Sequence, residues 1–262
     1  MTLDDWIHGH AFLRPLARLH ARVGEAITAA APACPPLPDW DAYDADFASG
    51  VPLLASPATA IDTTAIDRAI ERVMAAVQDG DPPVDEGFVH AIGWLTRAAA
   101  LAPLRQAFDL WRDEDQWLRP HCPTCGSQPA MAQLAGVDPG RQRLLSCGCC
   151  RTRWRFRRTT CPFCETQSHR LASLGIEGEG GLRIDYCESC RGYLKTYSGQ
   201  GDESVLLADW TSLHLDLAAG ARGWRRTAAS LYRLPSDPDS TPAYRSGSEM
   251  AEGSVQAARA DR

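Results

Sequence analysis

Eight cysteines arranged in four C-x-x-C pairs are the residues of this sequence best suited to chemistry. Two thiolates three positions apart on a tight turn can both reach one ion, and two such turns complete a tetrahedral site of four sulfurs. The sequence therefore predicts two metal sites. Cys122, Cys125, Cys147 and Cys150 form the first, and Cys161, Cys164, Cys187 and Cys190 form the second.

The spacing between the pairs indicates a duplicated unit. Between Cys125 and Cys147 lie 21 residues, and between Cys164 and Cys187 lie 22. Each interval contains two strand-like runs around a glycine-rich turn, and a third run follows the second pair. We expect two three-stranded modules of the zinc-ribbon or rubredoxin kind. Their strands are predicted at 130–135, 141–146, 170–174 and 182–186 and in the runs RTRWRFRR and RGYLKTY.

The four-thiolate composition of each site limits its chemistry. A closed all-thiolate site leaves no coordination position for water, which argues against hydrolytic metal catalysis. Thiolate tetrahedra accept both iron and zinc, so we expect two metal ions of either kind. Because a unit of ~40 residues buries too little surface to fold unaided, the ions should be structural. Cys149 is interpreted as an incidental thiol beside the first site and Cys34 as a packed side chain. We predict no catalytic residue and no organic cofactor site.

The segments around the cysteines are predicted to be helical. Apolar residues recur at helical spacing from Thr63 to Asp79 and again from Phe88 to Ala99, after which Pro103 starts a separate helix. Residues 4–30 are a candidate for a further helix, whereas the proline-rich segment 32–57 is expected to be an irregular connection. A helix within 205–220 should dock on the N-terminal helices.

The predicted fold class is α+β, with a mainly helical N-terminal domain, two tandem modules and a C-terminal helix. The expected division is a helical domain at 1–118, metal-binding modules at 119–158 and 159–201, and a helical segment packing on the rest at 202–235. Residues 236–262 contain almost no large apolar side chains and are predicted to be a disordered tail.

Composition and charge restrict the class of protein. With 44% hydrophobic and 23% charged residues, the chain is typical of globular proteins, not of fibrous or disordered ones. No apolar run reaches the ~18 residues of a membrane span, and Asp4 and Asp5 stand where a signal peptide would be basic. We therefore expect a cytoplasmic protein with reduced thiols and no membrane insertion.

Charge is unevenly distributed along the chain. Residues 1–118 carry a net charge of −10 and residues 119–170 one of +7, within a total of −6. The basic stretch is compatible with nucleic-acid binding. However, a divalent ion held by four thiolates carries about −2, which nearby arginines would offset. Local compensation explains the basic stretch about as well as recognition of nucleic acid.

Three runs carry a resemblance to a known family: CPTCGSQP, LLSCGCCRTRWRFRRTTCPFC and YCESCRGYLKTY. In order and spacing they resemble the formate dehydrogenase accessory proteins of the FdhE type, as do FASGVPLL at Phe47–Leu54 and LADWTSLHLDL at Leu207–Leu217. The resemblance implies a cytoplasmic assembly factor, not an enzyme. It also implies binding to the catalytic subunit of respiratory formate dehydrogenase before twin-arginine export, with rubredoxin-like, iron-associated sites at the eight cysteines. The family's Asp-Asp pair is Asp209-Trp210 here, the N-terminal region looks short, and the tail from Ser236 is extra.

Three hypotheses follow for function. The leading one is a maturation factor for formate dehydrogenase. The alternatives are a nucleic-acid-binding zinc-ribbon protein, which would use Arg153, Arg155 and Arg157, and a rubredoxin-like electron-transfer protein. The sequence leaves open the choice of metal, the partner surface and homo-oligomerisation.

Overall fold

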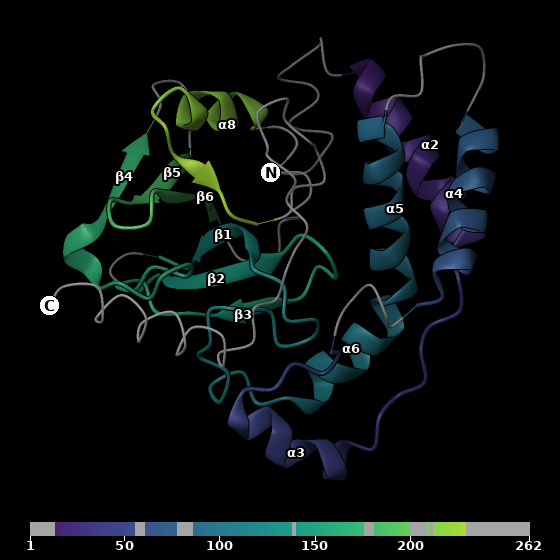
Figure 1. Cartoon of the computed structure of the whole chain (residues 1–262), viewed down its shortest axis with the longest axis horizontal. Coiled ribbons are helices and arrows are strands. Elements are labelled where there is room, and N and C mark those ends of the chain that lie inside the picture. Colours follow the sequence, from purple (N-terminus) through teal and green to yellow (C-terminus); the bar gives the residue numbers. More distant parts are fainter. Residues whose placement is uncertain are drawn as a thin grey trace, which may run out of the picture.

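A computed structural model shows a group of helices beside one twisted β-sheet (Figure 1). The structure describes residues 14–55, 61–77, 86–137, 140–175, 181–199, 209 and 212–228. Three helices stand together along one side of the sheet: α2 (Arg14–Ala30), α4 (Thr63–Val77) and α5 (Glu86–Ala100). Within the described residues, no helix is both long and apolar enough to cross a bilayer.

The helix predicted from Thr63 to Asp79 is present as α4. Its buried residues recur every three or four positions and pack against Val23 and Ile27 of α2 and Ile92 of α5. The Asp62 carboxylate accepts a hydrogen bond from the Thr64 amide, which caps the start of this helix. The candidate helix at 4–30 is present from residue 14 onward, and residues 1–13 lie outside the described part of the chain.

The helix break predicted at Pro103 is confirmed. Helix α5 ends at Ala100, and α6 (Ala102–Trp111) follows with the proline in its first turn, where a missing amide hydrogen leaves no bond unmade. Leu104 and Phe108 are the buried residues of α6.

The expectation of an irregular connection at 32–57 is wrong in its centre. Helix α3 (Trp40–Ser49) lies there, capped by the Asp39 side chain and ended by Gly50 at a φ of +86°. The prolines stand before the cap and after the end, so none interrupts the helix. Buried Tyr43 and Phe47, four residues apart, face the core.

All six predicted strands are present in the sheet. In chain order they are β1 (Pro129–Ala135), β2 (Gln142–Cys147), β3 (Arg153–Arg155), β4 (Leu171–Gly175), β5 (Leu182–Cys187) and β6 (Gly192–Gly199). Within each module the neighbouring strands pair antiparallel. This pairing brings the second cysteine pair of each module back beside the first.

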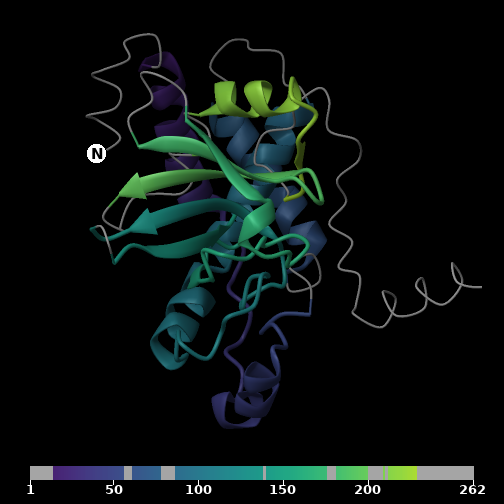
Figure 2. The same cartoon turned by 90° about the vertical axis from the view of Figure 1, so that its left-hand side faces the viewer.

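The two modules are joined into one sheet. Strand β1 of the first module pairs in parallel with β6 of the second, from Met131 opposite Lys195 to Ala135 opposite Gly199. The resulting order is β3-β2-β1-β6-β5-β4, with the short β7 (Arg225–Arg226) pairing β6. Figure 2 shows the teal strands of the first module and the green strands of the second running side by side.

Helix α8 (Leu213–Gly220) covers one face of the second module. Its buried Leu215 and Ala219 pack against Leu182, Ile184 and Tyr193 of β5 and β6. The expectation that this helix docks on the N-terminal helices is therefore wrong, because the apolar face of β5 and β6 is its partner. Residues 201–208 and the tail predicted at 236–262 lie outside the described residues.

The main core joins the helices to the first module. One buried cluster contains Phe47, Phe108, Trp117 and Trp154 together with Cys122, Cys125, Cys147 and Cys150. Trp154 and Phe156 are buried, while Arg153 and Arg155, which alternate with them, are half-buried and Arg157 is exposed. The first four-cysteine group is thus positioned by packing from both parts of the chain.

Candidate metal sites

The structure brings the eight paired cysteines into two quartets, in the pairing that the spacing predicts. Within each quartet all Sγ atoms lie within 4.8 Å of one another. The Sγ atoms of Cys122 and Cys150 are 3.5 Å apart, and those of Cys161 and Cys190 are 3.8 Å apart. A tetrahedron with metal–sulfur bonds near 2.3 Å has edges of about 3.8 Å. The donor sets therefore fit a four-thiolate ion, and none of the ten cysteines forms a disulfide.

The four C-x-x-C turns share one backbone geometry. In each turn, the residue after the second cysteine donates its amide hydrogen to the carbonyl of the first cysteine, at 2.9 to 3.1 Å. That residue has a positive φ in every case: 70° at Gly126, 64° at Arg151, 57° at Glu165 and 61° at Arg191. Three of the four are not glycine, so the turn conformation is held by its surroundings.

The first quartet is sealed inside the core. Its cysteines are between 0 and 3% exposed. Thr152 Oγ1 lies 3.2 Å from Cys150 Sγ and 2.7 Å from Thr124 Oγ1. The amides of Leu53 and Leu54 donate to the carbonyls of Pro123 and Thr124, so the segment after α3 is fastened to the first turn. This contact gives the FASGVPLL segment a structural role beside the first quartet.

Burial raises the pKa of the Cys122 and Cys147 thiols. In the metal-free protein these groups are therefore protonated at neutral pH, and ion binding must displace their protons. Cys149 lies beside the quartet and is buried, and its hydrogen bond with Cys125 together with burial raises its pKa. Cys34 is half-buried against the same core, as predicted.

The second quartet needs a glycine beside it. A Cβ atom added at Gly192 would lie 2.9 Å from the Phe163 ring and 3.2 Å from Cys190 Sγ. The Gly192 amide donates to Cys190 Sγ and the Phe163 amide donates to Cys161 Sγ, both at 3.4 Å. Amide hydrogens aimed at sulfur stabilise thiolates, which suits a metal ligand.

The structure contains a buried network of ion pairs next to the sheet, which the sequence analysis did not predict. Lys195 Nζ lies 2.7 Å from Asp209 Oδ1 and 2.6 Å from Asp216 Oδ2, and Arg226 contacts the same two carboxylates. The Tyr193 hydroxyl donates to Asp216 Oδ1 at 2.7 Å. Burial opposes ionisation of Asp209, but Arg226 and Lys195 outweigh it and lower the pKa of that carboxyl. The signal available in the sequence was Lys195, a charged residue within the strand-like run RGYLKTY.

This network also bears on Asp209-Trp210, which replaces the Asp-Asp pair of the resembled family. Asp209 is buried and bound to Lys195 and Arg226. Its carboxylate is therefore fully used within the fold.

The basic stretch is partly neutralised within the chain. Arg155 pairs with Asp115 and with the Gln142 side chain. Arg143 is buried and donates to the carbonyls of Arg157 and Thr160, while its guanidinium stacks on Phe156. Both side chains therefore bind within the fold.

Comparisons with known proteins identify relatives of this chain. No protein-family model matches the sequence. The sequence is 36% identical to the FdhE homologue of Pseudomonas aeruginosa over 124 residues, which cover 44% of this chain and 40% of the relative. It is 35% identical to the FdhE homologue of Stutzerimonas stutzeri over 135 residues, 48% of this chain and 42% of the relative. The matched region thus spans less than half the length of these relatives.

The fold extends this likeness over most of the chain. The crystal structure of the FdhE protein from Pseudomonas aeruginosa matches with a TM-score of 0.61 at 25% identity, covering 87% of this chain and 90% of that one. The chain is thus similar to FdhE proteins in sequence and in fold. Within it, the helical region, the sheet and both quartets occur in the order that the sequence predicts.

Proposed function

We propose that this chain is a non-catalytic accessory factor in the formation of formate dehydrogenase. Its similarity to FdhE proteins in sequence, supported by a structural match over most of the chain, is the observation that carries the proposal. The partner is the catalytic subunit of formate dehydrogenase, bound in the cytoplasm before twin-arginine export.

Two metal ions, iron or zinc, belong to the proposal. Cys122, Cys125, Cys147 and Cys150 would hold one, and the second quartet would hold the other. When bound, each ion supplies a cross-link between two turns, and iron would add one-electron redox chemistry. The domain division at residues 118, 158, 201 and 235 is part of the same proposal.

The experiment that tests the proposal is co-purification from a host that makes the enzyme. A tagged chain should retain the catalytic subunit, and deletion of its gene should abolish formate dehydrogenase activity. Cys147→Ser should lose complementation because it removes a ligand, whereas Cys149→Ser, in the same turn but outside the quartet, should retain it. Absence of binding together with normal activity in the deletion strain would overturn the proposal.

Arg143 and Arg155 form their hydrogen bonds and ion pairs within the fold, which favours the accessory role over nucleic-acid binding. Binding to DNA or RNA at low salt, abolished when Arg153, Arg155 and Arg157 are neutralised, would reverse that preference. Metal analysis and an absorption spectrum of protein purified without oxygen address electron transfer, because zinc is redox-silent.

A further inference from the structure

The two quartets differ in their contact with solvent. All four cysteines of the first are buried. In the second, Cys161 and Cys187 are buried, Cys190 is partly exposed and Cys164 is exposed. The sulfurs are also wider apart, since Cys164 and Cys187 Sγ are 3.7 Å apart and their counterparts Cys125 and Cys147 are 3.5 Å apart.

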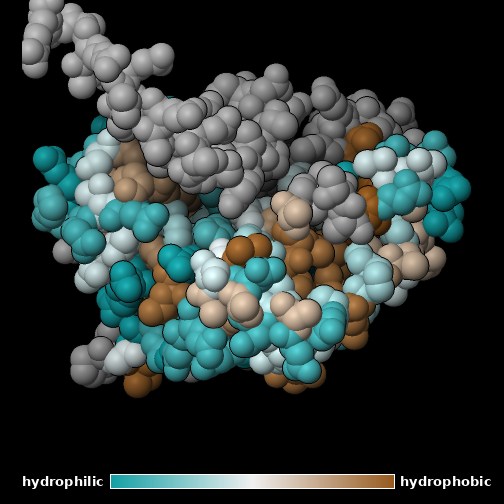
Figure 3. Space-filling model, turned by 60° about the horizontal axis from the view of Figure 1, so that its bottom comes forward, coloured by the Kyte–Doolittle hydropathy of each residue, from teal (hydrophilic) through white to brown (hydrophobic). Residues whose placement is uncertain are grey.

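Packing explains the difference. The first quartet belongs to the core cluster that includes Trp117 and Trp154, so aromatic side chains exclude water from it. The second quartet is near the far edge of the sheet, where Phe163 is partly exposed. Figure 3 shows apolar groups, in brown, exposed among polar ones on the lower face of the molecule. The outermost ligand of the second quartet therefore meets water directly.

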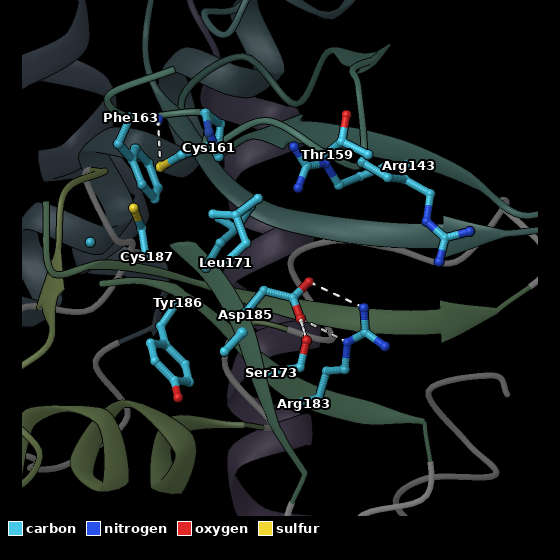
Figure 4. A pocket seen from close by; sticks show the side chains of 15 residues that line it. Arg143, Thr159, Cys161, Phe163, Leu171, Ser173, Arg183, Asp185, Tyr186 and Cys187 are labelled. Atoms are coloured by element: carbon cyan, nitrogen blue, oxygen red, sulfur yellow. Dashed lines mark hydrogen bonds and ion pairs between the residues drawn. The ribbon is translucent and has the colours of Figure 1, made fainter. Parts of the chain in front are cut away.

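A cavity of about 340 Å³ adjoins the second quartet, with Cys161 and Cys187 in its lining. Figure 4 shows Phe163 beside these two cysteines and Leu171 next to them. Arg183 and Asp185 line the cavity, whereas Leu182 and Ile184 alternate with them along β5 and pack toward α8. The cavity is thus on the face of the second module that α8 leaves uncovered.

Apart from the charge of the metal site itself, the side chains that line this cavity are net positive. Among the lining residues that the structure describes, Arg143, Arg158 and Arg183 stand against the carboxylate of Asp185. That carboxylate is fully occupied, because it accepts hydrogen bonds from Arg183 at 2.8 Å, Ser173 at 2.6 Å and Thr196 at 2.7 Å.

Among the residues that the structure describes, Arg143 and Arg158 donate their side-chain hydrogen bonds to backbone carbonyls, and neither guanidinium forms an ion pair. Nε of Arg143 is buried without a hydrogen-bond partner in this part of the chain. The cavity therefore favours an anion.

Exposure and charge act on the same step of metal exchange. A four-thiolate ion exchanges when an incoming ligand forms a bond to it and one thiolate departs, and zinc accepts the fifth ligand transiently. An exposed thiolate departs most easily because water can solvate it. A positive surface beside the ion raises the local concentration of anionic chelators.

We propose that the second quartet is an exchange site and the first a permanent one. The ion of the second quartet is passed to or from a small carboxylate-bearing chelator that the arginine-lined cavity attracts, and Cys164 is the first thiolate displaced. With an ion bound, the metal–sulfur bond to Cys164 would break as a metal–oxygen bond to the chelator formed, and water would solvate the freed Cys164 thiolate, so no electron would change hands. This inference rests on the metal-binding part of the proposed function.

The test is stopped-flow release of zinc from fully loaded protein to the anionic chromogenic chelator 4-(2-pyridylazo)resorcinol. Two phases of one ion each are expected, with rates that differ roughly tenfold or more. Cys164→Ser should remove the fast ion only, and the matched Cys125→Ser should remove the slow ion only. Equal rates for both ions, or a fast phase that survives Cys164→Ser, would overturn the inference. Protein that binds no metal at all would instead overturn the metal-binding proposal.

A second arm tests the charge of the cavity. Arg158→Gln should slow the fast phase several-fold with the anionic chelator and leave it unchanged with a neutral pyridine-based chelator. The control is Arg170→Gln, an exposed arginine paired with Glu188 at 3.8 Å and outside the cavity lining. Equal slowing with both chelators would show a structural effect, and no slowing with either would remove the role of the cavity.

Discussion

At the scale of single residues, spacing predicts the metal ligands but not the backbone that holds them. The C-x-x-C pattern identifies the eight cysteines of the quartets because two sulfurs must converge on one ion. It does not reveal the left-handed residue that closes each turn, since arginine or glutamate occupies that position in three turns of four.

The left-handed position gives a stability prediction. Gly126→Ala should lower the free energy of unfolding of the metal-loaded protein by about 1–2 kcal/mol, because alanine is strained at a φ of 70°. Glu165→Gly, the equivalent position of the third turn, should not destabilise. Urea unfolding measures both, and an unchanged midpoint for Gly126→Ala would contradict the argument.

Cys164 gives a prediction on pH. Burial opposes ionisation of this thiol, but hydrogen bonds with Thr166 outweigh it and lower its pKa to about 7. In metal-free protein, the rate of alkylation of Cys164 by iodoacetamide should rise as pH increases through about 7, because the thiolate is the nucleophile. Burial raises the pKa of Cys161, so that thiol should react only at higher pH. Peptide mass spectrometry resolves the two, and identical pH profiles would count against this assignment.

At the scale of elements, long-range ion pairs fix α8 and β7 to β6. Lys195 comes from β6, Asp216 from α8 and Arg226 from β7. No sequence period announces such a network, because its members are brought together only when the strands and the helix pack. The segments YCESCRGYLKTY and Leu207–Leu217, which resemble the family, contain Lys195 and Asp216 but do not reveal that these residues pair, and Arg226 lies outside both segments.

Loss of one member should leave a buried charge unpaired. Asp216→Asn is expected to lower the free energy of unfolding by about 3–5 kcal/mol. Asp44→Asn, on the exposed face of α3, should change it by less than about 0.5 kcal/mol. Denaturant unfolding of the loaded proteins compares the pair, and equal effects would refute a structural role for the network.

Helix α3 was not predicted because prolines and aspartates dominate the sequence around it, while only Tyr43 and Phe47 mark its buried face.

Phe47→Ala should lower the free energy of unfolding by about 3–5 kcal/mol, since the ring is buried against Phe108 and Trp117. Leu110→Ala, at a side chain that is 89% exposed, should have little effect. A thermal or urea melt checks this, and a neutral Phe47→Ala would mean that α3 is not anchored by its aromatic face.

At the scale of the whole molecule, the strands of each module were predictable and their union was not. Alternation and turns define a hairpin locally, whereas the choice of β1 and β6 as neighbours depends on which edges meet after folding. The shared core likewise joins distant segments that local patterns treat separately.

Because the first quartet lies in that shared core, its loss should be felt far along the chain. Cys147→Ser should raise hydrogen exchange in α3 and α6, whereas Cys187→Ser should raise it mainly in β4 to β6. Hydrogen-exchange mass spectrometry of both variants distinguishes them. Equal exchange in α3 and α6 would show that the helices do not depend on the first site.

The parallel pairing of β1 with β6 relates the modules by translation. The first strand of one module meets the third strand of the other in the same direction, so β4 and β3 at the two margins are the counterparts of β1 and β6, the strands that form the internal seam. Further copies of the chain could therefore pair with the sheet at either margin without limit. Two features of β3 oppose such fibre growth at one margin. The strand is only three residues long, and the guanidinium of Arg112 occupies the Arg153 carbonyl.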